Sequence, residues 1–128
     1  MALDSYAEVQ SDLTLIQLSL TDMTTPKALL AIATPPRRID HIILSSTSAS
    51  GHDVALYAHM TNINYMVAVV SVPAGAGTSA VPPVDLIAAL PGAFGGLAVS
   101  TSVGLYIGCL VALSGAEVIN AVAIGGYL

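Results

Sequence analysis

A stretch in the middle of the chain, residues 67–92, most constrains what this sequence can fold into. It opens with a β-branched run that ends at Pro73, and a loop of small residues with two glycines follows. Two consecutive prolines close this loop, and a second apolar run then ends at Pro91 and Gly92. Proline removes a donor from a β-ladder and glycine permits positive φ. This order therefore predicts a strand, a shaped connection, a short apolar segment and a turn.

Short apolar runs of similar length lie on both sides of this stretch, and turn residues separate them. In residues 38–46 the alternation predicts that Ile39 and His41 face one way and that Ile42 and Leu44 face the other. Eight or nine strands are expected, and the clearest of them cover residues 13–20, 28–34, 38–46, 53–60, 65–72, 97–100, 104–113 and 117–124. Short strands at regular spacing indicate an all-β fold, and we predict a single antiparallel β-sandwich of jelly-roll type.

The 128 residues suffice for one domain with a real core. We place the sandwich domain at residues 25–128 and an N-terminal arm or edge strand at residues 1–24. From Leu13 the arm alternates with both faces partly apolar, and such a strand gains most by adding to a sheet edge, its own or a partner's. We therefore expect the arm to reach a neighbouring subunit, and deletion of residues 1–20 to weaken assembly but not folding.

Charge is scarce. Charged residues make up 9% of the chain, against about 25% in ordinary soluble domains. The formal net charge is −5 and only three residues are basic, so we expect no nucleic-acid partner, which would need a Lys/Arg footprint. After His59, Asp85 and Glu117 are the only charged residues. So neutral a surface predicts coverage by other subunits or by lipid.

A small membrane-acting protein is the alternative from a different class, because the mean hydropathy is +0.81. The best candidate span, residues 94–113, is interrupted by glycines and serines, and no Lys or Arg flanks an apolar run after residue 38. A spanning helix needs about 20 apolar residues and carries flanking positive charge. The sequence therefore favours a protein outside the membrane.

Three histidines, His41, His52 and His59, are the candidate metal ligands. They fall on different expected strands or loops, whereas zinc needs three or four converging ligands. We therefore expect hydrogen-bonded histidines, with no metal and no cofactor.

A Ser/His/Asp triad could combine the serines of residues 45–50 with His41 and Asp40. The sequence lacks a Gly-x-Ser-x-Gly elbow, and neighbouring residues on a strand face opposite ways, which spoils the orienting hydrogen bond of a triad. We expect no enzymatic activity. Cys109 lies in an apolar run and is predicted to be buried as a small hydrophobic residue.

One basic pair, Arg37 and Arg38, stands at the entrance to an expected strand. Either the pair is simply solvated, or it meets acidic residues of a neighbouring subunit's arm. A surface pair of this kind adds at most about 1 kcal/mol, so it would set register more than stability. The candidate partner interface therefore consists of Asp4, Glu8, Asp12, Arg37 and Arg38.

Several segments, taken in order, resemble small all-β virion proteins of tailed bacteriophages. They are residues 34–50 (TPPRRIDHIILSSTSAS), 54–57 (VALY), 71–78 (SVPAGAGT), 104–108 (GLYIG) and 125–127 (GGY). The resemblance covers about residues 28–128, and it rests on short motifs of strands and turns.

This resemblance implies a structural role in the virion, after assembly in the host cytoplasm. The main expectation is a capsid decoration (cement) protein that binds and stabilises the assembled head, with a head-fibre or tail/baseplate component as the alternative. The implied partners are the chain itself, as a homotrimer, and the major capsid protein or another virion protein. We expect the strands after Tyr65 to supply most of the contact between subunits. The family offers no catalytic residues to transfer.

Overall fold

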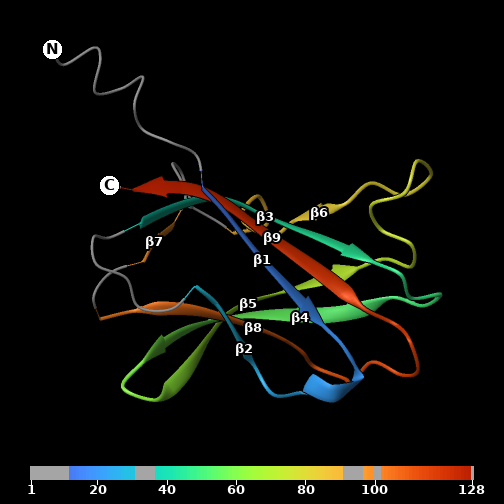
Figure 1. Cartoon of the computed structure of the whole chain (residues 1–128), viewed down its shortest axis with the longest axis horizontal. Helices are drawn as coiled ribbons and strands as arrows, with labels where there is room; N and C mark the ends of the chain where they lie inside the picture. Colours follow the sequence, from blue (N-terminus) through green and yellow to red (C-terminus); the bar gives the residue numbers. More distant parts are fainter. Residues whose placement is uncertain (1–11, 31–36, 91–96, 100–101, 128) are drawn as a thin grey trace, which may run out of the picture.

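The computed structural model describes residues 12–30, 37–90, 97–99 and 102–127, and it confirms the predicted all-β fold as a single antiparallel β-sandwich (Figure 1). The five-stranded sheet contains β1 (Asp12–Leu18), β9 (Ile119–Tyr127), β3 (Arg37–Ser46), β6 (Val84–Asp85) and β7 (Leu97–Val99). The four-stranded sheet contains β2 (Lys27–Leu30), β8 (Gly104–Cys109), β4 (His52–Met60) and β5 (Ile63–Val72). A short 3-10 turn, η1 (Leu20–Asp22), is the one helical piece in the described residues.

The strands pair in a nested order. β1 pairs with β9, β2 with β8, β3 with β6 and β7, and β4 with β5, all antiparallel. Two further antiparallel pairs, β3 with β9 and β4 with β8, complete the two sheets. The chain therefore folds back on itself as a long ribbon whose inner and outer pairs lie in alternate sheets.

The core lies between the two sheets and is built from the inward side chains of nearly every long strand. Strand alternation puts apolar residues on the inner faces, and burial of that kind drives folding at about 25 cal/mol per Å². The largest fully buried side chains are Leu18, Leu29, Ile39, Ile42, Leu44, Val54, Leu56, Val72, Leu86, Ile107, Leu113 and Ile119. Cys109 is buried, as predicted, and its burial, together with the charge of Asp22, raises the pKa of its thiol.

One prediction about strand β3 is wrong. Ile39 was expected on the face of His41, but Ile39 and Ile42 are both buried in the core while His41 is exposed. The pairing of β3 with β9 shifts between Ile39 and His41, because an extra residue bulges at this point. A β-bulge changes the phase of the alternation without a change in the sequence pattern.

The predicted 1–24 segment is only partly described. Residues 1–11 lie outside the described residues, and residues 12–18 form β1 at the edge of the five-stranded sheet of this same chain. Leu18 at the end of β1 is 1% exposed and belongs to the core. Within the described parts of the chain, no helix is long and apolar enough to cross a membrane.

Candidate functional site

The five predicted interface residues fall into three groups: two outside the described residues, one on β1 and two on β3. Asp4 and Glu8 lie outside the described residues, and Asp12 opens β1 opposite Gly125. Arg38 Nε lies 2.8 Å from Oδ1 of Asp40 on the same strand, so this ion pair is internal to the chain. The five residues remain a predicted partner interface.

Arg37 joins two strands of the five-stranded sheet. It begins β3, and its Nη2 donates to Oγ1 of Thr14 in β1 at 3.5 Å. Strand β9 lies between β1 and β3 in the sheet, so the guanidinium reaches across it. This hydrogen bond links β1 to the basic pair at the start of β3.

The three histidines lie apart, and each has its own partner. His41 Nδ1 is 2.6 Å from Oδ2 of Asp85. His59 Nδ1 is 2.6 Å from Oδ1 of Asn64, and its ring stacks on Tyr106 with centroids 4.0 Å apart. In the part of the chain that the structure describes, no three His, Cys, Asp or Glu side chains gather as they would around a metal ion.

His52 belongs to a polar cluster that the sequence did not predict. We call Ser48, His52, Ser114 and Glu117 the loop junction. Ser48 is 2% exposed and donates its hydroxyl proton to Oε2 of Glu117. His52 Nε2 lies 3.0 Å from the same hydroxyl oxygen, and Ser114 donates to Oε1 of Glu117 from its backbone N–H (3.1 Å) and its hydroxyl (3.0 Å). These contacts clamp two loops that are distant in sequence.

The loop junction contains serine, histidine and carboxylate but not the geometry of a catalytic triad. In a triad the carboxylate binds the histidine nitrogen that faces away from the serine. Here Glu117 Oε1 is 3.8 Å from His52 Nε2, the nitrogen that also contacts Ser48. Ser48 donates to the carboxylate of Glu117, whereas the serine of a triad donates to the histidine. The arrangement suits a structural clamp.

The hydrogen bonds from Ser48 and then those from Ser114 lower the pKa of Glu117 from 4.5 to about 2, and the charge of His52 adds to this shift. Because the folded-state pKa is below the ordinary value, the clamp's contribution to stability is complete above pH 4.5 and is lost as the pH falls toward 2. We expect wild-type Tm to fall more than that of Glu117→Gln between pH 5 and 2.5. Parallel Tm curves for the two proteins would contradict this role.

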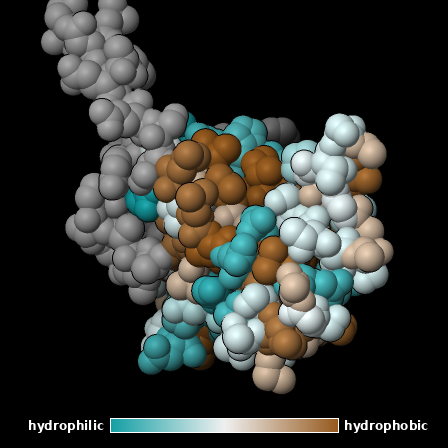
Figure 2. Space-filling model, turned by 45° about the vertical axis from the view of Figure 1, so that its right-hand side comes forward, coloured by the Kyte–Doolittle hydropathy of each residue, from teal (hydrophilic) through white to brown (hydrophobic). Residues whose placement is uncertain are grey.

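Apolar side chains cover part of the outer face of the five-stranded sheet. We define the sheet patch as Leu13, Leu15, Ile43, Val122 and Ile124. The register places Leu15 and Ile43 on either side of Val122, and Leu13 beside Ile124. Leu15 is 68% exposed, and Figure 2 shows hydrophobic side chains gathered next to hydrophilic ones on this side of the molecule.

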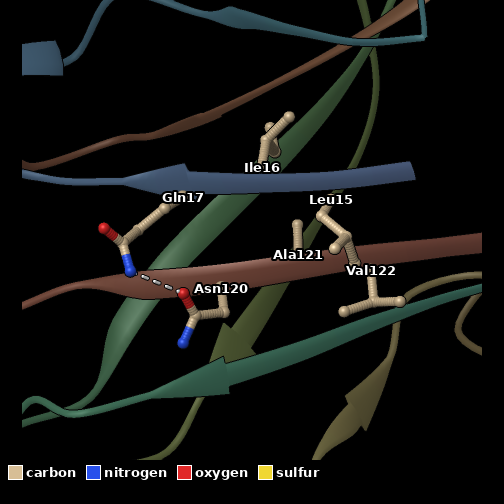
Figure 3. A pocket seen from close by; sticks show the side chains of 6 residues that line it. All are labelled: Leu15, Ile16, Gln17, Asn120, Ala121 and Val122. Carbon is tan, nitrogen blue, oxygen red and sulfur yellow. Dashed lines mark hydrogen bonds between the residues drawn. The ribbon is translucent and has the colours of Figure 1, made fainter. Parts of the chain in front are cut away.

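A shallow depression of about 420 Å³ between β1 and β9 shares Leu15 and Val122 with the sheet patch and is otherwise lined by Ile16, Gln17, Asn120 and Ala121. In Figure 3, Leu15 lies next to Val122, and Gln17 Nε2 donates to Oδ1 of Asn120 at 2.9 Å. An apolar floor with an amide pair at one end suits a flat partner surface better than a small ligand, which needs an enclosing pocket.

A second apolar surface lies on β5, at the edge of the four-stranded sheet. We define the β5 edge as Ile63, Tyr65, Met66, Val67 and Val69. These five side chains are 42–55% exposed. Among the described strands, only β4 pairs with β5, so one side of its main chain has no neighbouring strand. Exposed apolar side chains beside an unpaired strand edge are typical of surfaces that contact proteins or membranes and of edges prone to aggregation.

No family model, curated protein or solved structure matches this chain. The fold and the two apolar surfaces are therefore the features that bear on function. The β5 edge lies mostly in the part of the chain after Tyr65, whose strands are expected to contact other subunits, and that contact stays a prediction.

Proposed function

We propose that this chain is a non-enzymatic structural protein of a bacteriophage virion, a decoration protein that binds and stabilises the assembled head. The observation that carries the proposal is the pair of exposed apolar surfaces, one on each sheet. Monomeric soluble proteins rarely expose contiguous apolar surface of this kind unless it is an interaction site. Two such surfaces fit a protein that must contact both its own copies and a particle.

We also propose that the sandwich is a jelly roll. Its strand pairs nest in the order β1 with β9, β2 with β8, β3 with β6 and β4 with β5, in two four-strand rows once the short β7 is set aside. A ribbon of antiparallel pairs that is rolled into two sheets has this order, and viral capsid domains commonly use it. A fold alone does not establish a function, so this topology supports the proposal without carrying it.

The two surfaces take different partners in this proposal. The sheet patch binds the major capsid protein or another virion protein, and the β5 edge contacts further copies of the chain. The expected homotrimer is part of the proposal, and the number three rests on the resemblance to phage proteins. Attachment to a head fibre or to the tail would use the same two surfaces at another place on the particle.

The proposal is tested with virus particles that are assembled without this chain. Purified chain is mixed with them, and binding is measured by cosedimentation and located by cryo-EM. We expect wild type to occupy regular positions on the head. Leu15→Lys, at the most exposed position of the sheet patch, is expected to weaken binding at least about tenfold, because it places a charge within a desolvated contact.

Leu110→Lys is the matched control, since Leu110 is also exposed but lies outside both apolar surfaces. It is expected to bind particles as wild type does. Regular density on the fibre or the tail would assign the chain to that part of the particle and would still support a structural role in the virion. Absence of the chain from every particle, together with cosedimentation with lipid vesicles, would replace the proposal with the membrane-acting alternative.

A further inference from the structure

We infer that the β5 edge is covered by a second copy of this chain. The inference deepens the self-association in the proposed function and rests on that part of it alone. It concerns a specific strand and a specific occupant, so it can hold or fail whether or not the protein binds a virus particle.

The edge strands other than β5 are protected against pairing. Natural sheets protect their edges with short strands, charged side chains, proline or bulges. β6 and β7 contain two and three residues, and β2 contains four with an irregular register. At the edge of β1, Lys27 Nζ donates to the carbonyl oxygen of Gln17 at 3.0 Å.

β5 lacks most of these protections. It is ten residues long and contains neither a charged residue nor a proline. Its one irregularity is a bulge opposite Leu56 and Tyr57, which adds Val67 to the strand. The bulge interrupts the row of unpaired main-chain groups, which leaves two shorter segments. A partner on this edge would therefore contact the exposed side chains as well as the main chain. Of the described strands, β5 is thus the long edge left open for pairing.

Charge allows a copy of the same chain as the occupant of the β5 edge. The chain as a whole carries −5, so two copies repel one another over most approaches. The β5 edge has no charge to repel or to select a charged partner. The nearest acidic side chain along the ladder, Asp53, accepts a hydrogen bond from Ser71 at 2.8 Å, beyond the apolar part of the strand. Here two copies can meet without like charges in contact.

The available area is also close to what a stable contact needs. At roughly 200 Å² for a large side chain, five that are about half exposed present roughly 500 Å² per copy, divided between the two faces of the strand. The unpaired main chain and the flanking hairpin residue Met60, itself exposed, add to this area. A standard interface buries about 800 Å² per partner. The β5 edge therefore forms most of one such interface.

The test uses a near-isosteric change. Met66→Lys keeps an unbranched side chain and adds one charge to the β5 edge, as natural edge strands do. Met23→Lys is the matched control, because Met23 is exposed to a similar degree and lies in the turn between β1 and β2. Sedimentation velocity at micromolar concentration gives the mass of each protein, and circular dichroism confirms that each is folded.

We expect wild type and Met23→Lys to sediment as the same oligomer, and Met66→Lys to dissociate with a Kd at least about tenfold higher. Tyr65→Lys, on the same edge, gives the same result by a second route if Met66→Lys does not fold. A mass of two copies fits main-chain pairing of β5 strands, and a mass of three fits packing of their side chains about a threefold axis; both support the inference.

A wild-type protein that is monomeric at these concentrations overturns the inference, as does an oligomer that Met66→Lys and Tyr65→Lys leave intact. Dissociation by Leu15→Lys in place of the β5 variants would assign the contact to the sheet patch and overturn it too. Loss of particle binding with the oligomer preserved contradicts the proposed virion role only. The two proposals therefore fail by different measurements.

Discussion

Replacing Gly125 with alanine is expected to lower the free energy of unfolding by about 4 kcal/mol or more, the exceptional range for one substitution. A Cβ atom at this position would lie 1.9 Å from the carbonyl oxygen of Arg38 and 2.9 Å from its carbonyl carbon. Both are backbone atoms, so no side chain can rotate to relieve the overlap. The bulge in β3 brings this backbone over β9, and only glycine leaves room for it.

Gly51→Ala is the control for this experiment. A Cβ at Gly51 would lie 3.6 Å from the carbonyl oxygen of Val72, an ordinary contact, so we expect a change within about 0.5 kcal/mol. Urea unfolding at neutral pH measures both variants against wild type. If the two alanine variants prove equally stable, the close passage of β3 over Gly125 is wrong.

The bulge in β3 is a feature that the sequence pattern does not predict. Alternation of apolar and polar residues predicted the strand at residues 38–46, and the structure has β3 at Arg37–Ser46. It could not place the bulge, because the extra residue is fixed by the pairing with β9, far along the chain. Alternation of side chains predicts where a strand lies and which of its residues face the core only while the pairing with the next strand stays regular.

The loop junction could not be predicted from the sequence for a related reason. Ser48 and Glu117 are 69 residues apart, and nothing in the serine-rich segment distinguishes the hydroxyl that contacts Glu117 from those of the other serines. Only the antiparallel pairing of β3 with β9 brings the loops beyond these strands together. Long-range pairs of this kind leave no local spacing to recognise.

The β5 edge had a partial signal. A neutral, β-branched run was expected at residues 65–72, and its lack of charge suggested contact between subunits. Yet the same run would suit a central strand, buried on both sides. Whether it stands at an edge depends on the order of the strands in the sheet, which composition does not determine. The structure places β5 at the edge of the sheet, and this position leaves one side of its main chain without a neighbouring strand.

The N-terminal segment is where sequence and structure lead to different experiments. The sequence predicted that residues 1–20 could be deleted without loss of the fold. In the structure, β1 pairs with β9 along seven residue pairs, and Leu18 lies in the core. A deletion that ends before Asp12 is therefore expected to spare the sandwich, whereas one that passes Leu18 removes a strand and a core side chain.

Two leucines of β1 separate these possibilities by single substitutions. Leu18 is fully buried, so Leu18→Ala is expected to lower the free energy of unfolding by about 3 kcal/mol, from lost burial and the cavity that remains. Leu15 lies three residues earlier on the same strand and is exposed, so Leu15→Ala is expected to change it by less than about 0.5 kcal/mol. Urea unfolding of both variants at a concentration where the oligomeric state is unchanged makes the comparison. A small effect at both positions would mean that β1 is a detachable arm. A large effect at Leu18 alone would mean that β1 is part of the folded domain.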